Sequence, residues 1–225
     1  MLLYLKANLT LILLVLGMLG SQPEQIKILI IGDSISIGYT PFVQETLKDI
    51  AQVSHNPGNA QHTGTGLANI ESWIGDEEWD IIQINWGLWD LCYRHPDSKE
   101  EGKRDKANGT VTFSQDDYRD NLDSLVRLIR KKSEAKLVFV TTSYVPQGEP
   151  GRNVKDAIKY NRIAKKVMKS HNITINDIYK KSIDIHHDSA IAANDVHYTK
   201  KGYEALGTEI SDFLKTVIEL RINSK

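Results

Sequence analysis

The chain has 225 residues, of which 40% are hydrophobic and 25% are charged, and this length and composition suit one globular domain with a sizeable core. Its formal net charge at pH 7 is −1, so no basic excess indicates a nucleic-acid-binding surface and no nucleic-acid partner is expected. The sequence contains no internal repeat and no second domain boundary.

The first residues differ from the rest of the chain. Met1–Lys6 carries one positive charge, Leu9–Leu19 is almost wholly apolar, and the small residues Gly20-Ser21 follow. This pattern predicts a signal peptide over residues 1–21 and a mature domain over residues 22–225. The apolar run is short for a spanning helix, and an uncleaved N-terminal anchor is the alternative. We therefore expect a secreted, periplasmic or cell-envelope protein that meets a membrane only through an uncleaved N-terminal segment.

A short aliphatic run, Ile28–Ile31, ends at Gly32-Asp33-Ser34. An apolar run that contains β-branched residues predicts a buried strand of a parallel sheet. In open α/β sheets the ligand crevice lies beyond the carboxyl ends of the strands, so Ser34 stands where chemistry is expected. The alternative interpretation is that Asp33 and Ser34 only cap the next helix.

Helical and strand patterns alternate along the rest of the chain. The expected elements are a helix over 41–53, a loop over 54–66, a helix over 67–74, a strand over 79–84, a polar surface insertion over 95–112, a helix that Ser114 caps, a strand over 137–142, a Pro- and Gly-rich loop over 144–152, a helix to about residue 170, a weak strand over 173–178, and a final amphipathic helix around Tyr203–Ile218. This alternation predicts an α/β fold, a three-layer α/β/α sandwich with a central, mostly parallel sheet.

Three segments carry groups suited to catalysis. Gly32-Asp33-Ser34 follows the first strand, Asn85–Asp90 (Asn-Trp-Gly-Leu-Trp-Asp) follows the strand over 79–84, and Asn194–His197 precedes the last helix. Together these segments resemble the conserved blocks of the SGNH/GDSL hydrolase superfamily, over roughly residues 26–220. The first and last blocks match that superfamily well, and the middle two depart from it. The resemblance implies a flavodoxin-like SGNH hydrolase fold and a serine esterase activity.

A serine hydroxyl is a weak nucleophile unless a base activates it and a third group orients that base. The resemblance implies that Ser34 is the nucleophile and His197 the base. The acid of that superfamily stands three residues before the histidine, and Asn194 occupies this position here. We predict that Asp195 orients His197 instead, and a Ser–His dyad held by a backbone carbonyl is the alternative.

The resemblance also implies an oxyanion hole, in which each donor contributes roughly 3 kcal/mol. The first donor is the backbone N–H of Ser34, and the second in that superfamily is a glycine N–H in the loop after its second strand. Gly58, Gly64 and Gly66 lie in the corresponding loop here, and we choose Gly64. The third donor in that superfamily is an asparagine side chain, but Trp89 stands in its place. We predict Asn85 as this donor, with Asn59 and the indole N–H of Trp89 as alternatives.

Trp86, Trp89 and Tyr93 predict an aromatic rim that suits sugar rings or acyl chains. We therefore expect a small-molecule or glycan ester substrate, foremost an O-acyl group on a carbohydrate, cleaved through an acyl-enzyme intermediate. The alternatives are a lipid or thioester acyl hydrolase and a non-catalytic glycan-binding relative.

No phosphate loop, dinucleotide fingerprint or His/Cys metal cluster occurs in the sequence, so neither a cofactor nor a metal is expected. His186-His187-Asp188 could suggest a metal site, but neighbouring residues on a strand would point to opposite faces. The oligomeric state is not predicted.

Overall fold

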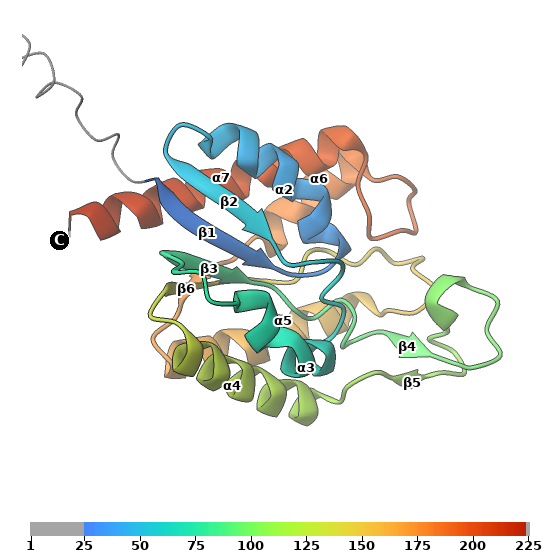
Figure 1. Ribbon diagram of the computed structural model, residues 1–225. Helices are drawn as coiled ribbons and strands as arrows, with labels where there is room; N and C mark the ends of the chain where they lie inside the picture. Colours follow the sequence, from blue (N-terminus) through green and yellow to red (C-terminus); the bar gives the residue numbers. More distant parts are fainter. Residues whose placement is uncertain (1–24, 224–225) are drawn as a thin grey trace, which may run out of the picture.

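Figure 1 shows a computed structural model of the chain, which describes residues 25–223. The predicted signal peptide over residues 1–21 lies outside the described residues. Within residues 25–223, no helix combines the length and the apolar character needed to cross a bilayer.

The centre of the fold is a five-stranded sheet in the order β2-β1-β3-β6-β7, and every neighbouring pair is parallel. The strands are Ile26–Ile31 (β1), Ala51–His55 (β2), Ile81–Ile84 (β3), Lys136–Val140 (β6) and Thr174–Asn176 (β7). In β1, Ile28 pairs with Val53 of β2 and with Ile81 of β3. Because β1 has helices on both faces, it needs apolar residues at consecutive positions, which explains the run Ile28–Ile31.

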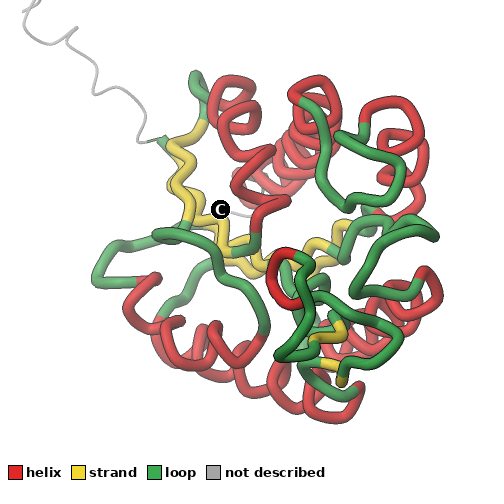
Figure 2. Tube along the Cα trace, turned by 90° about the vertical axis from the view of Figure 1, so that its right-hand side faces the viewer, coloured by secondary structure: helices red, strands yellow, loops and turns green. Residues whose placement is uncertain are grey.

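Helices cover both faces of this sheet. They are Ser34–Leu47 (α2), Thr63–Ile74 (α3), Gln115–Lys132 (α4), Val154–Ser170 (α5), Tyr179–Ser189 (α6) and Lys200–Ile222 (α7). Figure 1 shows α2, α6 and α7 on one face and α3, α4 and α5 on the other, and Figure 2 shows the strands between the two groups. The predicted three-layer α/β/α sandwich is confirmed, and Ser114 caps α4 as expected.

Two glycines bring α2 and α7 into close contact. A Cβ atom on Gly38 would lie 2.2 Å from the Tyr203 ring, and one on Gly207 would lie 2.6 Å from the Cβ of Phe42. Larger residues at either glycine would therefore push the helices apart. This contact matters for the site because α2 begins at Ser34 and α7 begins shortly after the loop that carries His197.

The polar segment predicted as a surface insertion forms an antiparallel hairpin beyond the carboxyl ends of the strands (Figure 1). Its elements are Tyr93–Arg94 (β4), the short 3₁₀ helix Glu101–Lys103 (η1) and Thr110–Val111 (β5). The Nζ of Lys106 donates a 2.7 Å hydrogen bond to the carbonyl oxygen of Glu149, which ties the hairpin to the loop before α5.

Two expected helices differ from the structure, and one helix was not expected. The helix predicted over 41–53 is α2, which begins at Ser34 and ends at Leu47, and the residues after it form the edge strand β2. The helix expected from residue 67 begins earlier, at Thr63. Residues 179–189 form α6, which no prediction covered, so His186 and His187 lie on a helix rather than on a strand.

Candidate active site

A pocket of about 270 Å³ lies at the carboxyl edge of the sheet. Ser34, at the start of α2, lines it together with Asp195 and His197 from the loop before α7. Asn59, from the loop after β2, and Trp89, from the loop after β3, also line it. The strand order reverses between β1 and β3, and this is the place where doubly wound α/β folds bind their ligands.

A continuous chain of hydrogen bonds joins the three residues predicted as a triad. The Oγ of Ser34 lies 2.9 Å from the Nε2 of His197, and the Nδ1 of His197 lies 2.6 Å from the Oδ1 of Asp195. Asn194 is exposed to solvent, whereas Asp195 faces the imidazole ring. The structure therefore places Asp195, and not Asn194, where an orienting acid acts.

The charge state of Asp195 suits that position. Burial raises its pKa, but the hydrogen bonds from the backbone N–H and the ring of His197 outweigh burial, and so the pKa of Asp195 lies below its ordinary value. The carboxylate is therefore ionised at neutral pH and able to stabilise an imidazolium ion.

Asp33 determines where α2 begins. Its Oδ1 accepts a 3.0 Å hydrogen bond from the backbone N–H of Ile35, which is the N-cap interaction, and its side chain is fully buried. Burial raises the pKa of Asp33. As the first residue of the helix, Ser34 has a backbone N–H without an intrahelical acceptor, at the positive end of the helix dipole. Because Asp33 caps α2 at this point, Ser34 becomes the first residue of the helix and faces the pocket.

The loop that carries Asp195 and His197 is held from behind by His186, which sequence reasoning considered only as a metal ligand. The Nε2 of this buried residue lies 2.6 Å from the carbonyl oxygen of Asp195. The rings of His186 and Tyr198 also pack in a T-shaped arrangement, with 5.7 Å between ring centroids. Within residues 25–223, no group of three or more His, Cys, Asp or Glu side chains could hold a metal ion.

Of the side chains and glycine predicted as oxyanion donors, some line the pocket and others do not. Asn59 lines the pocket, and its Oδ1 accepts a 2.8 Å hydrogen bond from the N–H of Gln61, which leaves its amide Nδ2 as the donor available to a ligand. Asn85 differs from expectation because it is buried and its Nδ2 donates to the carbonyl oxygen of Val140 at 2.8 Å. The amide of Asn85 therefore ties β3 to β6 below the pocket.

Gly64 also differs from expectation. It is the second residue of α3 and does not line the pocket, and a Cβ atom there would lie 2.7 Å from the ring of Phe113. His62 is the N-cap of the helix, and its Nδ1 accepts a 3.1 Å hydrogen bond from the N–H of Thr65. Asp90 also holds the first turn, because the N–H and Oγ1 of Thr63 both contact its Oδ1, at 2.9 and 2.5 Å. Burial raises the pKa of Asp90 to about 7.

The aromatic rim is smaller than the sequence predicts. Trp86 is fully buried and its Nε1–H donates to the carbonyl oxygen of Ala60 at 3.3 Å, so it belongs to the core. Trp89 lines the pocket, and the guanidinium of Arg94 lies over its ring, 4.6 Å from the centroid.

Three arginines that sequence reasoning missed also line the pocket: Arg94, Arg104 and Arg152. They come from the hairpin and from the loop before α5, where neither motif nor periodicity relates them to Ser34. Only the basic residues near the predicted insertion could have suggested them.

Comparison with known families agrees with this geometry. A model of the GDSL-like Lipase/Acylhydrolase family matches residues 30–205, a range that contains Ser34, Asp195 and His197. The chain belongs to this family. As a GDSL-like acylhydrolase, it is a hydrolase of ester bonds.

Solved structures show that the acylhydrolase shares its fold with other esterases. An acetyl xylan esterase superposes with a TM-score of 0.65 at 18% identity, covering 82% of this chain and 98% of that one. A lipase/acylhydrolase from Enterococcus faecalis gives a TM-score of 0.67 at 22% identity, with 85% and 96% covered. An acetylxylan esterase from Geobacillus stearothermophilus gives 0.63 at 17% identity, with 82% and 92% covered. No curated protein sequence matches the acylhydrolase significantly.

Proposed function

We propose that this acylhydrolase is a serine esterase that removes O-acyl groups from carbohydrates. The observation that carries the proposal is the hydrogen-bonded chain from Ser34 through His197 to Asp195 at the pocket. The carbohydrate substrate is supported by the fold shared with acetylxylan esterases and by Trp89 in the pocket wall, since aromatic rings pack well against sugars.

In the proposed reaction, the Oγ of Ser34 attacks the acyl carbonyl carbon while the Nε2 of His197 takes the hydroxyl proton. The tetrahedral intermediate then breaks its bond to the sugar oxygen, which receives the proton from His197 and leaves as the free alcohol. Water attacks the acyl-serine in the same way, and His197 first takes a proton from the water and then returns one to Ser34. Asp195 keeps the ring oriented and stabilises the imidazolium ion.

We assign the developing oxyanion to two donors, the backbone N–H of Ser34 and the Nδ2 of Asn59. Ser34 offers a free N–H at the helix N-terminus, and Asn59 lines the same pocket with its Oδ1 already occupied. Asn85 and Gly64 are not part of this assignment. The amide Nδ2 of Asn85 donates to the carbonyl oxygen of Val140, and Gly64 does not line the pocket.

Acetate release from O-acetylated xylooligosaccharides tests the proposal. The wild-type protein should release acetate, and the Ser34→Ala variant should not. The two proteins should unfold at the same temperature. Cleavage of long-chain 4-nitrophenyl esters in preference to the acetylated sugars would favour a lipid acyl hydrolase. Binding of the sugars without release of acetate would favour a non-catalytic glycan-binding protein.

We also infer that the acylhydrolase is exported, from the apolar run Leu9–Leu19 and the small residues after it. N-terminal sequencing of protein recovered from the medium or envelope should find a new terminus close to Ser21 or Gln22. An intact Met1 in the membrane fraction would instead indicate an uncleaved anchor.

A further inference from the structure

The pocket holds an arginine whose charge no carboxylate of residues 25–223 pairs. The Nε of Arg94 donates to the Oγ1 of Thr112 at 3.3 Å, and its Nη1 donates to the carbonyl oxygen of Gly102. With Trp89 under its plane, the guanidinium is held on three sides by neutral groups. These contacts fix its orientation and leave its positive charge unbalanced.

The other two arginines of the pocket share one carboxylate. The Nη1 atoms of Arg104 and Arg152 lie 3.0 and 2.7 Å from the same oxygen, Oε1 of Glu149. Glu149 is fully buried, and its Oε2 accepts a hydrogen bond from the N–H of Gly151 at 2.7 Å. Arg94, Arg104, Arg152 and Glu149 together therefore carry an excess of two positive charges.

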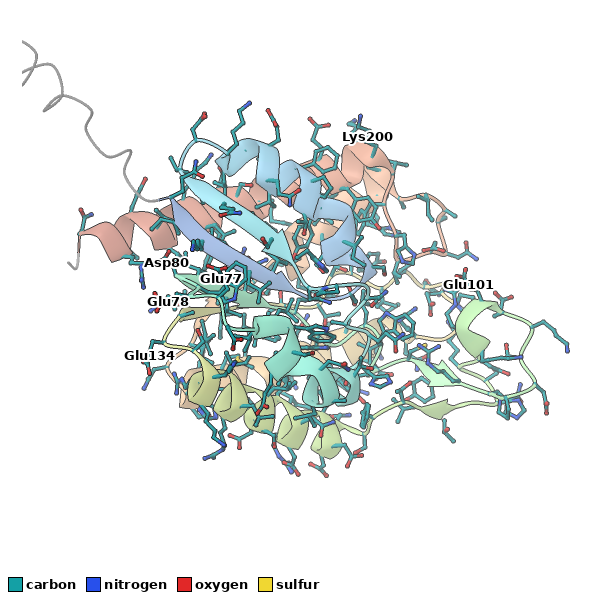
Figure 3. The ribbon with its side chains drawn as sticks, viewed as in Figure 1. Glu77, Glu78, Asp80, Glu101, Glu134 and Lys200 are labelled. Atoms are coloured by element: carbon teal, nitrogen blue, oxygen red, sulfur yellow. The ribbon has the colours of Figure 1, made fainter. Side chains whose placement is uncertain are left out.

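The remaining acidic groups that line the pocket, Asp195 and Glu101, form no ion pair with Arg94. The carboxylate of Asp195 is committed to His197. Glu101 is exposed on η1 at the outer end of the hairpin (Figure 3), and it forms an ion pair with none of the three arginines. The acidic residues Glu77, Glu78, Asp80 and Glu134 gather at the opposite end of the molecule, where the strands begin (Figure 3).

We propose that Arg94 binds a carboxylate on the substrate, so that the preferred ester of this acylhydrolase is an acidic one. This inference rests on the proposed serine esterase and names its substrate class. A guanidinium presents a planar fork of donors that matches a carboxylate, and a partly buried, unbalanced cation gains most from such a partner. Burial lowers the pKa of Arg94, and the charges of Arg152 and Arg104 lower it further, while the charges of Cys92 and Glu149 act in the opposite direction.

Two kinds of acidic ester could supply the carboxylate. In one, the alcohol carries it, as in an O-acetylated hexuronoside. In the other, the acyl group carries it, as in a 4-nitrophenyl hemiglutarate. For each acid, the matching carboxamide is a neutral control of almost the same shape. The quantity to measure is the ratio of kcat/KM for the acid to kcat/KM for its carboxamide.

For the acid that the pocket accepts, we expect this ratio to be about 10 to 100 in the wild type. This is the preference that one hydrogen bond to a charged group provides. Arg94→Gln should bring the ratio close to one, and Arg94→Lys should restore part of it. Arg127→Gln, on the exposed surface of α4, is the matched control and should keep the wild-type ratio. The wild-type ratio should also fall as salt is added, a measurement that needs no variant to fold.

A wild-type ratio near one for both acids would overturn the assignment of Arg94 and leave the esterase proposal intact. An unchanged ratio in a folded Arg94→Gln variant would do the same. If the wild type cleaves neither the acids nor their carboxamides, the proposed esterase fails, and the acidic substrate class fails with it.

Discussion

The Oδ1 atom of Asp195 accepts two hydrogen bonds from His197, one from the backbone N–H at 2.8 Å and one from the ring Nδ1 at 2.6 Å. The first contact fixes the turn between the two residues, and the second fixes the plane of the ring and the position of its proton. Asp195 thus reaches the imidazole ring from two residues before His197. In the SGNH/GDSL superfamily the acid stands three residues before the histidine.

Replacing Asp195 by Asn should lower kcat by about 10⁴, as loss of the correct tautomer does in serine protease triads. The amide keeps the shape of the side chain but removes the charge that stabilises the imidazolium ion. Steady-state kinetics on an acetyl ester measure the effect. Asn194→Ala is the control, because Asn194 is exposed, and it should stay within about twofold of wild type. A decrease of tenfold or less in Asp195→Asn would indicate a Ser–His dyad.

Ser34 should be the serine that a fluorophosphonate labels, because its Oγ contacts a histidine that itself contacts a carboxylate. Ser36 offers a matched control. Its Oγ lies 2.7 Å from the Nε2 of His55, but it is fully buried and also hydrogen-bonds to the carbonyl oxygen of Asp33. Mass spectrometry should find the label on Ser34 in the wild type and in Ser36→Ala, and nowhere in Ser34→Ala. A label on Ser36 would contradict the assignment.

Asn59→Ala should lower kcat about 10²- to 10³-fold with little change in the free energy of unfolding, as expected for loss of one oxyanion donor. Asn85→Ala should do the reverse. It removes the buried hydrogen bond to Val140 and should cost about 1–3 kcal/mol in unfolding free energy, with kcat of the folded protein retained. Kinetics and urea unfolding of both variants check this pair, and a loss of kcat confined to Asn85→Ala would reverse the assignment.

The stability of the acylhydrolase should depend on the ionisation of Asp90. In the folded state, burial raises the pKa of Asp90 to about 7, whereas an unfolded chain has an ordinary value near 3.8. Between these values the unfolded state gives up the proton and the folded state keeps it, so the free energy of unfolding falls as pH rises. The slope for one such proton is about 1.4 kcal/mol per pH unit.

Urea unfolding of the wild type and Asp90→Asn between pH 4 and pH 8 isolates this contribution, because the other groups are common to both proteins. The advantage of the wild type over the variant should shrink steadily from pH 4 to pH 7 and level off above. A difference that is independent of pH would show that Asp90 ionises with an ordinary pKa in the folded protein.

Sequence reasoning predicted the structure correctly where the local sequence alone determines it. The run Ile28–Ile31 had to form a strand buried on both faces, and Gly-Asp-Ser had to follow it at the edge where ligands bind. The neighbourhood of Ser34 and His197 was expected from the resemblance to the SGNH/GDSL superfamily, and Asp195 was chosen because it stands two residues before His197.

Sequence reasoning failed where the structure depends on contacts between residues far apart in the sequence or on buried polar side chains. Helix α6 buries Ser182, His186 and Ser189 on one face, so no apolar periodicity reveals it. Gly64 was chosen as a donor because the sequence does not show that α3 begins at Thr63, where Asp90, 27 residues further along the chain, accepts the Thr63 N–H. The three arginines of the pocket reach it from irregular segments whose paths depend on the whole fold.

The contact between Ser34 and His197 spans 163 residues. A growing polypeptide therefore exposes its serine long before the histidine is made, and the glycine contacts that join α2 to α7 form only after Gly207 has been added. Until then Ser34 is an ordinary hydroxyl without a base. The nucleophile thus acquires its base only after the chain has been made through His197, and a chain cut before His197 lacks the base that would activate Ser34.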